Sequence, residues 1–179
     1  MIIYMLITIK EGDQMLTDQD RRLLKLIAQD CRLKPEELSI QTGLSPDYVR
    51  SRISEWEKDK VIVGYQPMIN WARTGEEKVT ALIEVRVLPQ RGYGFDKIAK
   101  RLQKYPEITS LFLMSGGFDL ALLVEGKTMQ DVALFVAEKL APHEHVQSTA
   151  THFLLRRYKQ DGVELMGEEE TIQRLVVSP

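Results

Sequence analysis

The chain has 179 residues, of which 44% are hydrophobic, and its formal net charge is −2. This length and composition suit a globular protein of two small domains or one medium-sized domain. The single cysteine, Cys31, excludes a disulfide framework or a cysteine zinc site within one chain, and it favours the reducing cytoplasm as the compartment.

The N-terminal part of the chain is electrically balanced. Residues 1–75 contain eleven Lys or Arg and eleven Asp or Glu. This balance argues against nucleic-acid binding driven by bulk charge. Tight DNA binding would have to sum several copies of a modest contact, which requires an oligomer.

The first residues differ from everything that follows. The run MIIYMLITIK is apolar, but it is too short to span a bilayer and lacks the basic region and cleavage site of a signal peptide. No membrane association is therefore expected. Codons for Lys10-Glu11-Gly12 can form a bacterial ribosome-binding site before Met15, so residues 1–14 are predicted to be a non-native extension. The alternative is a genuine additional strand at a sheet edge.

Residues 15–60 predict three helices in the order of a winged-type helix-turn-helix DNA-binding domain. Thr17, with Asp20 three residues later, forms the N-terminal cap signature of a first helix. Pro35 begins a second, short helix that ends at Gly43.

The third helix is predicted to begin at Pro46, directly after the turn. Val49, Ile53 and Trp56 share one apolar stripe that should pack on the first two helices. The opposite side carries short polar and cationic side chains that suit a DNA major groove. The candidate DNA-binding residues are Ser45, Asp47, Tyr48, Arg50, Ser51, Arg52, Ser54 and Lys58.

Different contacts are expected within this set. Arg50, Ser51 and Ser54 are the candidates for base edges, and Arg52 is the candidate for a phosphate. The alternative is an ordinary helical hairpin whose polar face is simply solvated.

One pattern spans the turn, the third helix and the segment after it. It consists of Leu44, Ser45, Val49, Arg52, Ile53, Val61, Ile62, Gly64 and Tyr65. This pattern resembles that of the Lrp/AsnC feast/famine regulators. Two positions depart from the family pattern: Trp56 stands where leucine is usual, and Lys60 where a helix-stopping glycine is usual. The second departure affects the helix end and not the fold.

Residues 61–76 are predicted to connect two domains. A strand is expected from Val61 to Tyr65. An irregular link from Pro67 to Gly75 then contains the domain boundary.

Residues 77–166 predict a second domain of class α+β, because the hydrophobic period switches regularly between strand and helix values. Gly116-Gly117 predicts a hairpin turn, and Asp161-Gly162 a turn into a short fifth strand. The order βαββαβ is the ferredoxin-like plan, which also resembles the effector and oligomerisation domain of the same family. Strands are predicted at 79–88, 108–115, 118–125 and 146–158, and helices at 95–102 and 128–140.

One face of this sheet is expected to lack helices and to be too apolar for water. We therefore predict a homodimer built sheet to sheet, and the resemblance implies further association into higher even-numbered oligomers. The residues expected on this face are Leu82, Leu111, Leu113, Ala121, Leu123, Phe153 and Leu155.

The hairpin between the second and third strands is the candidate effector site. Glycine amides can approach a carboxylate closely, and Asp119 can take an ammonium group, so the site suits an amino acid. A simple tight turn is the alternative. The resemblance implies effector binding near this hairpin at a subunit interface. The candidates are Gly116, Gly117, Phe118, Asp119, Thr149 and Thr151.

Other motifs predict no cofactor or metal. His143-Glu144-His145 lies in a helix-to-strand loop without a third ligand at a suitable spacing, so a solvated loop is favoured over a metal site. Catalytic signatures such as a nucleophile elbow are missing from the sequence. Residues 167–179 form an acidic tail.

The sequence thus indicates a cytoplasmic transcription regulator that binds double-stranded DNA as an oligomer and responds to an amino acid. Two alternatives stay open. One is an enzyme resembling sirohaem decarboxylases, for which His152 and Arg156 share a face of the fourth strand. The other is an accessory module that senses amino acids without binding DNA.

Overall fold

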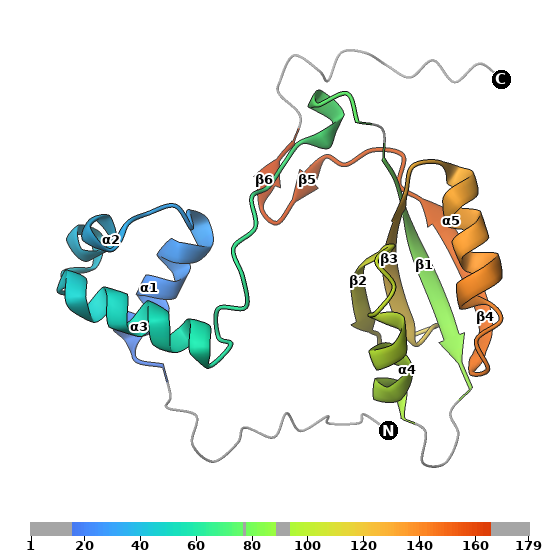
Figure 1. Cartoon of the computed structure of the whole chain (residues 1–179), viewed down its shortest axis with the longest axis horizontal. Coiled ribbons are helices and arrows are strands. Elements are labelled where there is room, and N and C mark those ends of the chain that lie inside the picture. The colour runs from blue at the N-terminus through green and yellow to red at the C-terminus, as the bar shows by residue number, and fades with distance from the viewer. Residues whose placement is uncertain (1–15, 77, 89–93, 166–179) are drawn as a thin grey trace. The chain divides into compact units, whose positions relative to one another are not determined.

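The computed structural model describes residues 16–165, except residue 77 and residues 89–93 (Figure 1). The predicted extension 1–14 and the acidic tail 167–179 lie outside the described residues. The chain divides into two compact units between Met68 and Ile69.

The first unit is built on α1 (Asp18–Gln29), α2 (Pro35–Thr42) and α3 (Pro46–Lys58). The predicted start signals are confirmed. Thr17 and Asp20 form a capping box at α1, and the Ser45 hydroxyl accepts the Tyr48 amide at α3. The three helices enclose one apolar core, which consists of Leu23, Ile27, Leu38, Val49 and Trp56.

The end of α3 shows why a glycine is usual there. Asp59 caps the helix, and Lys60 then takes a left-handed conformation with φ 61°. The Ile62 amide donates to the Trp56 carbonyl at 3.0 Å, and Ile62 packs against the core of the first unit. A left-handed residue with a Cβ costs about 1–2 kcal/mol, so Lys60 is strained where glycine would not be.

The strand expected from Val61 to Tyr65 is wrong. The structure assigns no strand to these residues, and Val63 is 85% exposed. A strand needs a neighbour for its hydrogen bonds, and no strand in the described part of the chain pairs with this segment.

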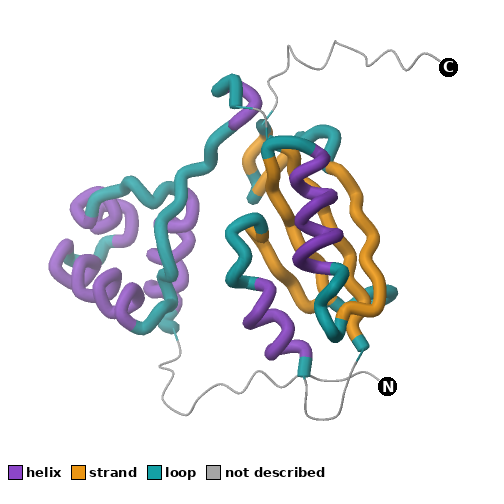
Figure 2. Tube along the Cα trace, turned by 45° about the vertical axis from the view of Figure 1, so that its right-hand side comes forward, coloured by secondary structure: helices purple, strands orange, loops and turns teal. Residues whose placement is uncertain are grey.

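The second unit contains a four-stranded antiparallel sheet in the order β2-β3-β1-β4. Helices α4 and α5 cover the same face of this sheet, as Figure 2 shows. This arrangement confirms the ferredoxin-like plan. The bounds are β1 Val79–Val87, α4 Phe95–Leu102, β2 Ile108–Leu113, β3 Leu120–Gly126, α5 Met129–Phe135 and β4 Val146–Phe153.

Shorter elements complete this unit. A 3-10 turn, η1 (Trp71–Arg73), precedes the sheet, and a π-helical turn, η2 (Val136–Leu140), extends α5. The predicted Asp161-Gly162 turn is confirmed, since it joins β5 (Lys159–Gln160) to β6 (Val163–Glu164).

The core of the second unit lies between the sheet and the two helices. Alternate residues of β1 and β3 point into it, as the sequence predicted. The buried strand residues are Ala81, Ile83, Val85, Val87, Leu120, Leu122 and Val124.

The predicted composition of the open face needs correction at the edge strands. The pairing register of β2 shifts between Ile108 and Ser110, which places Leu111 opposite Leu122 and Leu113 opposite Leu120, on the helix-covered side. Phe112, 51% exposed, stands on the open side instead. A shift of one residue reverses every side chain beyond it, and this shift cannot be read from hydrophobic alternation.

The fourth strand requires a similar correction. Phe153 pairs with Ala81 and packs in the core, and β4 ends there. Leu155 lies beyond the strand and is 89% exposed. Of the predicted open-face residues, Leu82, Ala121 and Leu123 keep their expected side.

Candidate nucleic-acid interface

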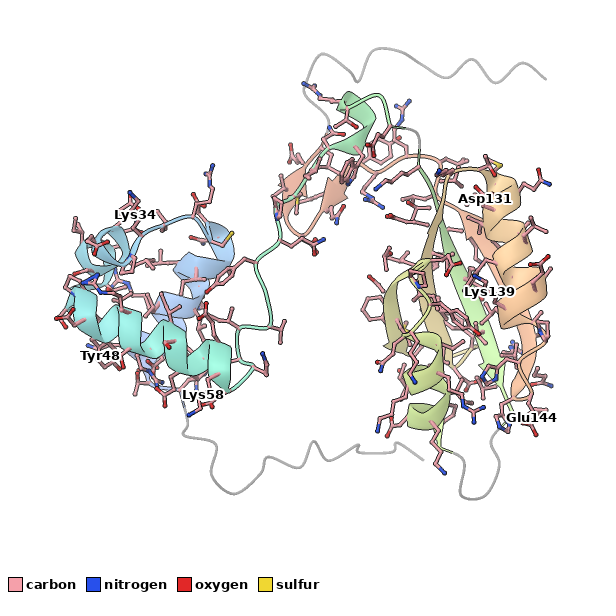
Figure 3. The ribbon with its side chains drawn as sticks, viewed as in Figure 1. Lys34, Tyr48, Lys58, Asp131, Lys139 and Glu144 are labelled. Carbon is pink, nitrogen blue, oxygen red and sulfur yellow. The ribbon has the colours of Figure 1, made fainter. Side chains whose placement is uncertain are left out.

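Helix α3 presents opposite buried and exposed sides. Val49 and Trp56 are buried and Ile53 is half-buried, which confirms the predicted stripe. All but one of the candidate DNA-binding residues are exposed. Figure 3 shows two of them, Tyr48 and Lys58, near opposite ends of the helix. The exposed members are Ser45, Asp47, Tyr48, Arg50, Ser51, Ser54 and Lys58.

Arg52 is the exception in the predicted set. Its side chain is only 14% exposed, and it donates two hydrogen bonds to the carboxylate of Asp20, at 3.0 and 2.9 Å. It also donates to Glu55 and stacks 5.0 Å from the ring centroid of Trp56. The guanidinium of Arg52 is therefore engaged within the protein and largely removed from solvent.

Asp20 links the start of α1 to the middle of α3. Its side chain is 3% exposed, and the Tyr48 hydroxyl donates to it at 3.5 Å. The Arg52 hydrogen bond lowers the pKa of Asp20 from its ordinary value, against the opposing effect of burial. The sequence revealed Asp20 as a cap, but a pair separated by 32 positions has no local signature.

Arg50 also contacts two carboxylates, but at the surface. Its Nη1 donates to Glu36 of α2 at 2.5 Å, and its Nη2 donates to Asp47 at 3.2 Å. The Arg50 side chain remains 50% exposed. The principal candidate for base reading is thus oriented by both helices of the helix-turn-helix.

The candidate effector hairpin has a glycine-specific turn. Gly116 has φ 152°, a value that residues other than glycine rarely adopt. The Asp119 backbone amide donates to the Val85 carbonyl at 3.0 Å, and its Oδ2 accepts the Val87 amide at 2.8 Å. Asp119 therefore fixes the end of β1 in addition to any role with a ligand.

The candidate threonines lie on the other side of β1 from this hairpin. Thr149 pairs with Val85 and Thr151 with Ile83, and both point to the helix-covered side. Within one subunit they are about two strand spacings, roughly 10 Å, from β3. The structure thus brings Gly116, Gly117, Phe118 and Asp119 together, but not with the threonines.

The residues invoked for a decarboxylase do not share a strand. His152 lies on the open face, with its Nε2 3.4 Å from Glu84 Oε1. Arg156 lies beyond the end of β4. The premise that these two side chains line one face of the fourth strand is wrong, because the strand ends earlier than its hydrophobic pattern suggests.

The histidine loop is packed and not solvated. His145 is 3% exposed, His143 is half-buried, and their ring centroids are 6.1 Å apart. Burial lowers the pKa of His143. No cluster of metal-ligating side chains occurs within the described residues, and no helix among them has the length and apolarity needed to cross a bilayer.

A helix-turn-helix unit with an exposed reading helix, followed by a ferredoxin-like unit, defines a DNA-binding transcriptional regulator with a separate ligand-binding domain. The model of the AsnC-type helix-turn-helix domain matches residues 16–55, and the model of the Lrp/AsnC ligand-binding domain matches residues 80–164. The chain belongs to the Lrp/AsnC family.

Individual relatives agree with this assignment. The HTH-type transcriptional regulator YugG of Bacillus subtilis is 41% identical over 166 residues, which span 92% of this chain and 99% of the relative. The proline dehydrogenase transcriptional activator of Rhodobacter capsulatus is 30% identical over 74% of this chain and 86% of its own length.

Solved structures show the same fold. The Mycobacterium tuberculosis leucine response regulatory protein LrpA has a TM-score of 0.71 at 24% identity, over 84% of this chain and 100% of that one. A Neisseria meningitidis regulator, solved as its complex with L-Met, has a TM-score of 0.67 at 24% identity, over 84% of this chain and 97% of that one.

Proposed function

We propose that this regulator reads DNA through the exposed side of α3 and that an amino acid modulates its binding. The observation that carries the reading role is the orientation of α3. Its apolar stripe and Arg52 are fixed to the rest of the first unit, which leaves Arg50, Ser51 and Ser54 exposed together. A helix held in this way can enter the major groove without rearranging.

Each side chain suits a different part of the duplex. The guanidinium of Arg50 fits the two acceptors of a guanine edge, and the hydroxyls of Ser51 and Ser54 can bond to any base. Ser45 and Lys58 have the hydrogen-bonding groups that position a protein on phosphates, whereas the Tyr48 hydroxyl already donates to Asp20.

Assembly into at least a dimer supplies the affinity that one neutral domain lacks. Two reading helices can occupy major grooves about 34 Å apart, and their contributions add. The open sheet face offers the dimer surface, because Leu82 is 36% and Phe112 is 51% exposed there. Such a regulator acts in the cytoplasm, where its DNA lies.

The effector site is proposed at the hairpin of Gly116 and Asp119. The Neisseria relative was solved with L-Met, and an amino acid would use the hairpin amides for its carboxylate and Asp119 Oδ1 for its ammonium group. Thr149 and Thr151 lie two strands away from β3 in the same subunit, so this proposed site does not include them. The effector would shift the assembly between states that engage different half-sites.

The test measures binding of the purified protein to DNA upstream of its own gene at physiological salt, with and without the twenty amino acids. Specific binding that shifts with the mixture supports both parts of the proposal. Specific binding without a shift would overturn the effector part. Absence of specific binding to this and to other promoter DNA would favour the accessory-module alternative.

A further inference from the structure

Arg50 is held between two acidic side chains from two different helices. Glu36 comes from the first turn of α2, and its Oε1 accepts from Nη1; Asp47 comes from the first turn of α3, and its Oδ1 accepts from Nη2. All three side chains are exposed, at 50% for Arg50, 59% for Glu36 and 94% for Asp47. This cluster stands on the same side of α3 as the proposed reading residues.

The arrangement leaves part of the guanidinium available. Arginine carries five N–H groups, and the two carboxylates use one on each terminal nitrogen. A guanine edge requires two N–H groups. Arg50 can therefore bond to a base while Glu36 and Asp47 still hold it.

Holding the arginine has two consequences for DNA binding. An arginine side chain loses conformational freedom when it is fixed on a base, and a side chain already fixed in the free protein loses less. A held guanidinium is also less available to any phosphate within its reach, because it would have to leave an existing partner. The first consequence favours the target sequence, and the second disfavours random DNA.

We propose that Glu36 is a specificity-determining residue that positions Arg50 for base reading and withholds it from phosphates. The proposal rests on the reading role of Arg50. Glu36 matters more than Asp47, because it makes the shorter contact and anchors Arg50 to a second helix, whereas Asp47 is on the same helix three positions away.

The test compares wild-type protein, Glu36→Gln and Glu36→Asp. The DNA is a target selected from a random pool by the wild-type protein, against a random duplex of the same length. The Gln variant removes the charge, whereas the Asp variant keeps the charge and shortens its reach. Thermal unfolding checks that each variant is folded.

Both variants should lower affinity for the target by about two- to five-fold per bound reading helix, the range of an exposed ion pair. Affinity for random DNA should stay the same or rise. The slope of log affinity against log salt concentration should steepen by about 0.9 for each new phosphate contact. Two outcomes would overturn the proposal, because each would mean that Glu36 acts through bulk charge. In the first, affinity for target and for random DNA changes equally. In the second, only the Gln variant differs from wild type.

A double-mutant cycle separates this proposal from the one on which it rests. In an Arg50→Gln background, Glu36→Gln should leave the ratio of target to random affinity unchanged. A persistent effect overturns the link between Glu36 and Arg50. If Arg50→Gln itself leaves the ratio at the wild-type value, the reading role of Arg50 fails, and the role of Glu36 fails with it.

Discussion

The carboxylate of Asp20 and the guanidinium of Arg52 form a two-bond ion pair that joins the start of α1 to the middle of the reading helix. Both side chains are largely removed from water, at 3% and 14% exposure. Because α3 must hold a fixed orientation to fit a groove, we expect this pair to act by positioning α3. Its consequences are open to measurement.

Removal of one partner should destabilise the first unit strongly. Arg52→Leu leaves Asp20 buried without its cation, and we expect a loss of about 3 kcal/mol in the free energy of unfolding. Urea unfolding followed by the fluorescence of Trp56, in a Trp71→Phe background, reports on this unit.

Arg32→Leu is the matched control for this measurement. Its pair with Asp30 is 87% exposed on the arginine side, so the change should stay within about 0.5 kcal/mol. Equal effects of Arg32→Leu and Arg52→Leu would contradict the importance of the buried pair.

The same pair predicts a pH dependence. The Arg52 hydrogen bond holds the folded-state pKa of Asp20 below its ordinary value, so the folded protein binds this proton more weakly than the unfolded chain does. The stabilisation is complete above the unfolded pKa and is lost as the pH falls through the folded pKa. The gap in unfolding free energy between wild type and Asp20→Asn should narrow below about pH 4. A gap that stays constant from pH 7 to pH 2.5 in urea titrations would show that the ionised carboxylate contributes nothing.

Lys60→Gly should stabilise the protein, unlike most glycine substitutions. Lys60 has φ 61° after the end of α3. Removal of its Cβ relieves backbone strain in the folded state, but glycine also raises the conformational entropy of the unfolded chain. We expect the strain to outweigh the entropy, with a net gain of about 0.5–1 kcal/mol in the free energy of unfolding. Lys58→Gly, at the last residue of α3, should instead destabilise the protein. Thermal or urea unfolding of the two variants side by side tests the opposite signs.

Arg50→Ala should relax sequence preference while leaving the oligomer intact. Loss of a bidentate arginine contact costs about 1–3 kcal/mol of discrimination at one base pair. Competition binding with single-base variants of the target locates that base pair. If Arg50 contacts a phosphate instead, affinity should fall equally for all sequences, and the slope of log affinity against log salt concentration should decrease by about one.

Phe112→Glu should weaken the proposed dimer. Phe112 is 51% exposed on the open face of the sheet, and a charge buried between two sheets is costly. Leu155→Glu is the control, because Leu155 is 89% exposed but lies beyond β4. Sedimentation of both variants at several protein concentrations measures the dimer dissociation constant. Equal dissociation constants for the two variants would exclude this face as the interface.

Much of the architecture was predictable because its signals are local. The caps at Thr17 and Ser45 each satisfy amides a few residues away, and the stripe of Val49 and Trp56 follows from helical spacing alone. The resemblance to the Lrp/AsnC family rested on such local patterns, and the comparisons confirm it.

The sequence by itself determined the helices, the order of the strands and the exposed side of α3, since these depend on residues close together in the chain. Only the tertiary structure decided that Phe112 and not Leu111 faces the open side, that residues 61–65 remain unpaired among the described strands, and that Arg52 binds Asp20. Each of these outcomes depends on which distant backbone or side chain supplies a hydrogen-bond partner. Such partners are set by register and packing across the fold, which periodicity along the chain does not encode.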